Sequence, residues 1–122
     1  MSRQSSLHPK KEVEQLPWAE WLEAVATADF YDEYGWAFTY QGQHDRALEY
    51  YEKALAIRLD TLGAEHPDVG WSYNSLGIAY NDQGDNDKAI EYYNKALAIY
   101  LETLGAEHSF TKAAQERLDA LR

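Results

Sequence analysis

The sequence contains no cysteine, and only 11 lysines and arginines stand against 21 aspartates and glutamates. Without cysteine, disulfides and thiolate metal sites are excluded. The formal net charge of −10 disfavours phosphate backbones and anionic membrane surfaces as partners, because like charges repel. No apolar run approaches the roughly 20 residues that span a bilayer, and residues 1–11 lack the apolar core of a signal peptide. We therefore expect a soluble cytoplasmic protein that binds neither nucleic acid nor membrane.

What the chain does contain is a long internal match. A shift of 42 residues aligns residues 35–66 with residues 77–108, and the hexapeptide TLGAEH recurs letter for letter at Thr61–His66 and Thr103–His108. A period of this size indicates one supersecondary unit that is copied and stacked, so that neighbouring units bury each other's apolar faces. The hexapeptide therefore recurs because the whole unit recurs.

Each unit is predicted to form two helices. Residues 73–80 carry apolar and small side chains at helical spacing, and Gly84 is expected to end that helix in a left-handed conformation. A second helix then runs on and stops at Gly105. Pro67 suits the first turn of a helix, and Ser109 is expected to be the N-cap of the last one.

The pattern resembles the tetratricopeptide repeat (TPR), whose units follow the spacing W-x2-L-G-x2-Y, A-x3-F, A. The matching positions are Tyr31, Tyr34, Gly35, Phe38, Ala47, Tyr51 and Ala54 in the first unit, and Tyr73, Leu76, Gly77, Tyr80, Ala89, Tyr93 and Ala96 in the second. The units exceed the usual length of about 34 residues. This longer form, with its ALAI-x-L-x-TLG-x-EHP signature, is similar to the repeats of kinesin light chains and of many bacterial scaffold proteins.

The resemblance implies an all-α fold, a right-handed α–α superhelix (TPR solenoid) of two full repeats. Repeat 1 is expected over about residues 28–66, repeat 2 over 67–108, and a polar capping helix over 109–121. Gly35, Tyr80 and the other matching small and aromatic residues are implied to pack the helices together; the remaining members of this set are Ala47, Tyr51, Ala54, Leu76, Gly77, Ala89, Tyr93 and Ala96.

The N-terminal region is expected to add two features to the single domain of residues 12–122. An extra helix over about residues 16–26, with an apolar stripe that includes Trp18 and Trp21, either covers the first repeat or meets a second molecule. Residues 1–11 are expected to form a mobile basic tail.

Two histidines raise the question of catalysis or metal binding, because His66 and His108 each follow a glutamate. A catalytic or metal site needs a third convergent group, and nothing nearby in the sequence supplies one. Both histidines lie at helix junctions, so their expected role is structural. We predict no enzyme activity, no cofactor and no metal site.

The face of the first helices opposite the packing stripe is the candidate binding surface, because in the family it lines a concave groove that holds an extended peptide. Trp36 and Trp71 fall on this face, where they either contact a ligand or pack between successive helices. The basic clamp that one subfamily uses for C-terminal carboxylates is matched here only by Arg117. The candidate peptide-binding residues are Asp29, Asp32, Trp36, Tyr40, Trp71, Asn74, Ile78, Asn81 and Glu116.

The resemblance implies a non-enzymatic scaffold that binds a peptide segment of a partner protein. The acidic residues on the candidate face favour a cationic or apolar ligand over an acidic one. The alternative is a structural module that self-associates through the N-terminal helix or the groove, because two full repeats are fewer than the three usually needed for stability.

Overall fold

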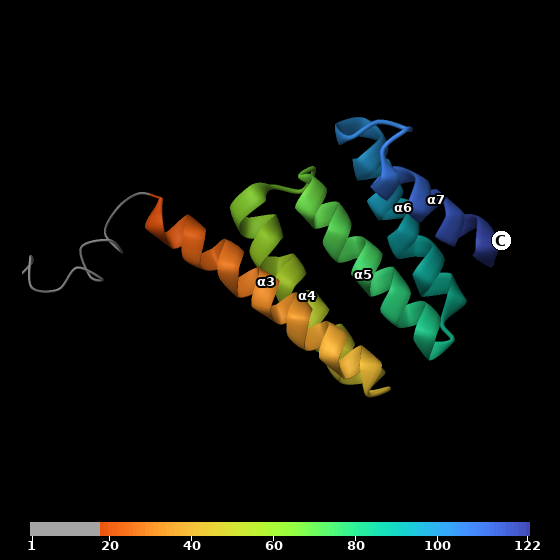
Figure 1. Cartoon of the computed structure of the whole chain (residues 1–122), viewed down its shortest axis with the longest axis horizontal. Coiled ribbons are helices and arrows are strands. Elements are labelled where there is room, and N and C mark those ends of the chain that lie inside the picture. The colour runs from red at the N-terminus through yellow and green to blue at the C-terminus, as the bar shows by residue number, and fades with distance from the viewer. Residues whose placement is uncertain (1–17) are drawn as a thin grey trace, which may run out of the picture.

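The computed structural model describes residues 18–122, which form five helices and no strand. In chain order these are α3 (Ala19–Tyr40), α4 (His44–Leu62), α5 (Pro67–Gln83), α6 (Asn86–Thr103) and α7 (Ser109–Leu121). They stack side by side as antiparallel pairs, with α3, α5 and α7 in one layer and α4 and α6 in the other (Figure 1). The expected all-α TPR solenoid is confirmed. The expected basic tail, residues 1–11, lies outside the described residues.

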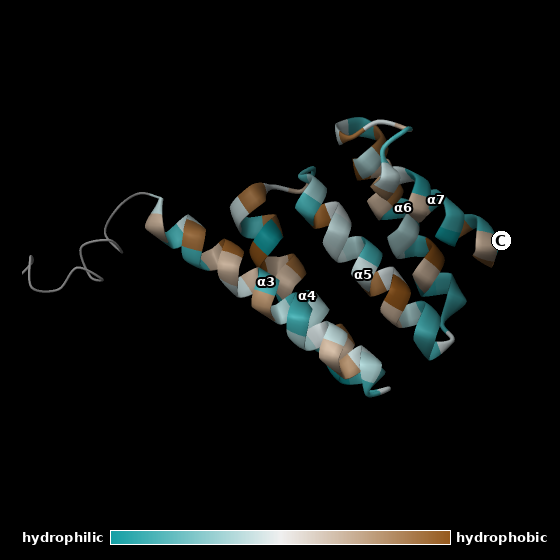
Figure 2. Ribbon diagram, in the orientation of Figure 1, coloured by the Kyte–Doolittle hydropathy of each residue, from teal (hydrophilic) through white to brown (hydrophobic). Residues whose placement is uncertain are grey.

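The core forms where small residues of one helix meet tyrosines of the next. Ala47, Ala54, Ala89 and Ala96 are fully buried, and Tyr51, Tyr93 and Leu76 lie beside them. Tyr80 is only half-buried and stacks on the ring of Tyr92. Polar residues collect at the α5–α6 turn and along α7 (Figure 2). Small side chains let the helix axes approach closely, and the aromatic rings fill the space beside them.

Three glycines show how close these contacts are. A Cβ atom added to Gly77 would lie 2.6 Å from the Tyr93 ring, and one added to Gly70 would lie 2.8 Å from the Tyr100 ring. Gly35 meets the ring of Tyr51 in the same way. Since each glycine holds a tyrosine of a neighbouring helix, glycine is required here for space rather than for backbone freedom.

The junctions show what the repeated hexapeptide does. His66 is the N-cap of α5, and its Nδ1 accepts a hydrogen bond from the Asp68 backbone N–H at 3.0 Å. His108 caps α7 in the same way, accepting from the Phe110 N–H at 3.0 Å. The prediction that Ser109 caps α7 is wrong, because Ser109 is the first residue of the helix. The histidines satisfy backbone donors that each helix start leaves unpaired.

The N-terminal helix differs from the prediction. The extra helix expected over about residues 16–26 is not a separate element, since α3 runs without a break from Ala19 to Tyr40. The positions one period before Gly63 and His66 are Trp21 and Ala24, so neither the glycine nor the histidine cap that breaks the later junctions is present. The first turns of α3 extend beyond the other helices (Figure 1). Trp18 and Trp21 are about half exposed there and do not cover the first repeat.

Candidate binding groove

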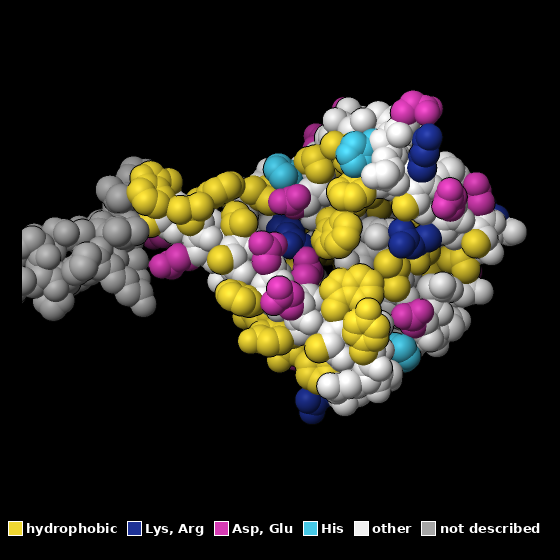
Figure 3. Space-filling model, in the orientation of Figure 1, with side chains coloured by type: hydrophobic (Ala, Val, Ile, Leu, Met, Phe, Trp, Pro, Cys, Tyr) yellow, Lys and Arg dark blue, Asp and Glu magenta, His cyan; other side chains and the backbone are white. Residues whose placement is uncertain are grey.

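The groove lies on the layer formed by α3, α5 and α7. A hollow of about 220 Å³ opens between these helices, and we call it the tryptophan hollow. A second depression of about 320 Å³ continues from it and shares Trp36, Ile78 and Arg117. Figure 3 shows hydrophobic side chains gathered over the middle of this face. The tryptophan hollow is lined by Trp36, Trp71, Asn74, Ile78, Tyr100, Phe110, Ala113 and Arg117.

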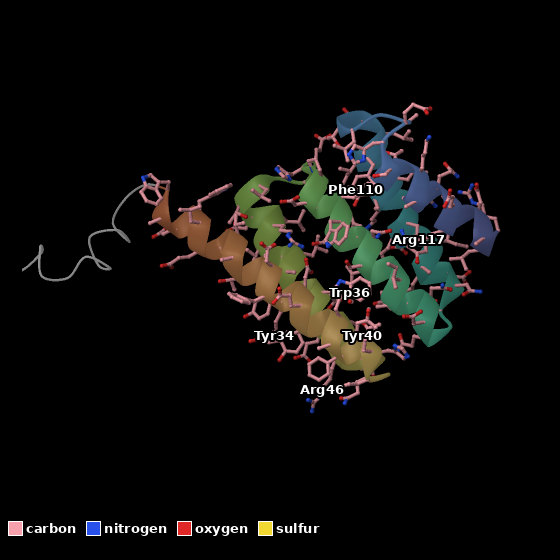
Figure 4. The ribbon with its side chains drawn as sticks, viewed as in Figure 1. Tyr34, Trp36, Tyr40, Arg46, Phe110 and Arg117 are labelled. Carbon is pink, nitrogen blue, oxygen red and sulfur yellow. The ribbon has the colours of Figure 1, made fainter. Side chains whose placement is uncertain are left out.

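The two tryptophans pack and are accessible at the same time. The Trp36 ring lies 6.2 Å from the Tyr51 ring in an edge-on arrangement, and the Trp71 ring lies 5.6 Å from the Phe110 ring. Both tryptophans are only partly buried. Each therefore packs with one side and turns another towards the hollow. Figure 4 shows Trp36, Phe110 and Arg117 around this space.

Two buried polar atoms at the tryptophan hollow lack partners. Asn74 and Tyr100 are 7% and 1% exposed, and neither Asn74 Oδ1 nor the Tyr100 hydroxyl has a hydrogen-bond partner among residues 18–122. Burial raises the pKa of Tyr100 to about 12, so its hydroxyl stays neutral at physiological pH. A buried polar group without a partner is unfavourable, and both atoms are shielded from solvent.

A buried ion-pair cluster lies in the same layer. Arg58 reaches from α4 to Asp32 and Asp29, with N–O distances of 2.6 and 2.9 Å, and donates to the Ser72 hydroxyl at 2.8 Å. Arg58 and Asp32 are buried, whereas the Asp29 side chain is 67% exposed. The pKa of Asp32 lies above its ordinary value because burial outweighs the attraction of Arg58.

This cluster places positive charge beside the acidic residues predicted for the groove. Asp29 and Asp32 are both paired with Arg58, and Arg117 adds a second guanidinium at the tryptophan hollow. Glu116 does not line the groove, because it borders a separate depression between α6 and α7. The sequence pattern missed Arg58 because it lies on the second helix of the repeat. One signal was present: Arg58 takes the place of Tyr100 in an otherwise matching inward-facing stripe.

The remaining predicted residues are placed as follows. Trp71, Asn74 and Ile78 line the tryptophan hollow with Trp36, and Asn81 lines the second depression. Tyr40 is 87% exposed, with its ring 6.4 Å from that of Trp36. Tyr100 and Phe110 were not among the residues predicted from the sequence. Tyr100 comes from the second layer, and Phe110 lies in the first turn of α7, so neither belongs to the helix face that the family pattern singles out.

Residues 18–122 contain no group of three or more histidine, cysteine or acidic side chains arranged to hold a metal ion. In the same part of the chain, no helix combines the length and hydropathy needed to cross a bilayer.

Comparison with known proteins places this architecture in a family. The tetratricopeptide repeat model matches residues 26–102, and the chain belongs to this family. It is similar to a crystal structure of a putative kinesin light chain with nearly identical TPR-like repeats from Podosopora anserina, at 28% identity and a TM-score of 0.72. It is also similar to a variant of that protein with a single substitution, at 28% identity and a TM-score of 0.70. A search of curated proteins found no match.

The similar structures are longer than this chain. The chain aligns over 97% of its length with 59% of each P. anserina protein. BtubC (BKLC) from P. vanneervenii has a TM-score of 0.70 at 23% identity, over 77% of this chain and 37% of that protein. The chain therefore spans about three-fifths of the P. anserina proteins and about a third of BtubC. TPR domains mediate contacts between proteins, and the repeats of this chain are similar to those of a putative kinesin light chain.

Proposed function

We propose that the protein is a non-enzymatic scaffold that binds a peptide segment of a partner protein along the groove, with one apolar or aromatic side chain seated in the tryptophan hollow. The observation that carries this proposal is the composition of that hollow. Accessible faces of Trp36 and Trp71 line it together with Ile78 and Phe110. At about 220 Å³, the space is smaller than the roughly 300–1,000 Å³ of pockets for drug-sized ligands, so it suits a single side chain.

A polar side chain at the rim can orient the peptide. Arg117 is exposed, lines the tryptophan hollow, and can donate hydrogen bonds to a peptide carbonyl. Because Asp29 and Asp32 are already paired, the apolar anchor rather than net charge decides affinity at this point. A cationic ligand still gains from the charge of −10 during encounter, and this gain falls as salt screens it.

The proposal is tested by selecting short peptides from a displayed random library on the full chain. We expect the selected peptides to share an aromatic or large aliphatic residue, and its replacement by alanine to weaken binding about tenfold or more. Reversing the charge of a neighbouring peptide residue should change affinity less. If reversing the charge weakens binding more than removing the apolar residue, in dilute and in concentrated salt, an apolar anchor is contradicted.

A blocking variant locates the site on the protein. Ala113 lines the tryptophan hollow, so Ala113→Trp should fill it and abolish binding of the selected peptides. Ala98→Trp places the same side chain on an exposed position of α6 and should leave binding intact. Circular dichroism melts check that both variants fold. If the two variants bind the peptides equally well, the peptides bind at a site other than the tryptophan hollow.

A further inference from the structure

Within residues 18–122, no element covers one face of α3, although the matching face of α5 is buried. On α5, Val69, Ser72, Ser75, Leu76 and Ala79 are each at most 1% exposed. Leu76 and Ala79 share an apolar cluster with Tyr51 of α4, and Ser72 accepts from Arg58 of α4. One period earlier, α3 carries exposed residues at the same five positions: Thr27, Phe30, Glu33, Tyr34 and Ala37.

This α3 end face is apolar at its centre, where one side of the Tyr34 ring packs on Tyr50 of α4 and the rest stays exposed. Phe30 is 58% exposed and Tyr34 is 52% exposed, and Ala37 lies one helical turn beyond them. Figure 4 shows Tyr34 on the side of α3 turned away from α5. The repeat geometry thus defines the α3 end face as a helix-docking surface, because the equivalent surface of α5 holds a helix.

The opposite end of the solenoid does not complement it. In α7, Gln115, Asp119 and Arg122 stand where Tyr73, Gly77 and Tyr80 of α5 contact the paired helix α6. Head-to-tail stacking would therefore place Phe30 and Tyr34 on a polar surface. A two-fold contact avoids this mismatch, because it pairs the apolar face with a second copy of itself.

We infer that two copies of the chain associate through antiparallel packing of their α3 end faces, with Phe30 near the two-fold axis. In this arrangement the two α3 helices run in opposite directions. A residue n positions after Phe30 in one copy therefore lies opposite the residue n positions before Phe30 in the other copy. Tyr34 then stands level with Ala26 of the other copy, and Glu33 stands level with Thr27. Glu23 stands level with Ala37, so no carboxylate opposes another.

The interface leaves the groove free, because the α3 end face and the tryptophan hollow lie on different sides of α3. The dimer would present two grooves and raise the avidity of the assembly for a partner that carries two binding segments. Two chains of charge −10 repel each other, so added salt should strengthen the dimer, in contrast to an interface between opposite charges.

Sedimentation velocity of the full chain over a wide range of concentrations tests the inference. We expect a monomer–dimer equilibrium that shifts towards dimer in higher salt. Phe30→Glu should weaken dimerisation about tenfold or more. Leu101→Glu is the matched control, because Leu101 is 48% exposed on α6, and it should dimerise like the wild type. A chain that stays monomeric throughout, or a dimer unaffected by Phe30→Glu, overturns the inference.

A mixed pair of variants tests the two-fold geometry itself. Phe30→Glu and Phe30→Lys should each dimerise more weakly than the wild type when alone, because the like charges face each other across the axis. An equimolar mixture should associate more tightly than either variant, since Glu then faces Lys. No gain on mixing would rule out a contact centred on Phe30. Neither result depends on peptide binding, so this test is independent of the proposed groove function.

Discussion

Gly77 of α5 lies directly against the ring of Tyr93 of α6, so close that a Cβ atom on Gly77 would stand 2.6 Å from it. We predict that Gly77→Ala destabilises the fold by about 1–3 kcal/mol, because the ring must move in a packed core. The higher helix propensity of alanine offsets at most about 1 kcal/mol of this. Thermal unfolding measures the effect, with Glu102→Ala at an exposed site of α6 as the control. An unchanged melting temperature for Gly77→Ala would contradict the close contact.

The fully buried Ala89 gives a second prediction. Ala89→Leu should overpack the α5–α6 contact and cost about 1–3 kcal/mol or more. Ala98→Leu adds the same volume at an exposed position of the same helix and should change stability by less than about 0.5 kcal/mol. Chemical denaturation of the two variants separates the effects. Equal stabilities would mean that the register of α6 differs from the one described.

The buried Arg58–Asp32 pair gives a pH-dependent prediction. Arg58→Ala should destabilise the fold by about 3–5 kcal/mol near neutral pH, because it leaves the Asp32 carboxylate buried without its partner. Loss of the guanidinium raises the pKa of Asp32 further. An acid whose folded-state pKa is raised loses stability as pH rises through the interval between its unfolded and folded pKa values.

The deficit of Arg58→Ala should therefore be largest near neutral pH and shrink in acid as Asp32 takes up a proton. Denaturation of the wild type and the variant across this range measures the difference. Adding Asp32→Asn to Arg58→Ala should remove most of the pH dependence of the deficit. A deficit that stays constant with pH would exclude Asp32 as its source.

The capping histidines give the fourth prediction. His66→Ala should cost about 0.5–2 kcal/mol through loss of the N-cap, while His66→Asn keeps an acceptor and most of the stability. His108→Ala should behave similarly at α7. Affinity for a groove peptide should stay near that of the wild type. Calorimetry with zinc should show no tight site, and a submicromolar site lost in either alanine variant would restore the metal hypothesis.

The sequence predicted the fold well because the residues that pack the helices recur at equivalent positions in both repeats. Gly77 and Ala89 each have a counterpart one period away, so the spacing alone marked both as packing positions. Arg58 has no such counterpart, since the second repeat has Tyr100 there. A pattern built from shared positions could not reveal an ion pair that exists once. Phe110 was missed because its role depends on how α7 sits against α5, which spacing within one helix does not specify.

The unbroken α3 has a mechanical consequence. At about 1.5 Å per residue, its 22 residues span roughly 33 Å, against about 26 Å for the 17 residues of α5. Tension or torque applied near Trp18 travels along one continuous hydrogen-bonded rod into the first repeat. Across the α4–α5 connection the helical hydrogen bonding is interrupted, because α4 ends at Leu62, Gly63 has a φ of 91°, and α5 begins only at Pro67. A force on α3 is therefore transmitted through one continuous helix, whereas a force between the repeats passes through a connection without helical hydrogen bonds.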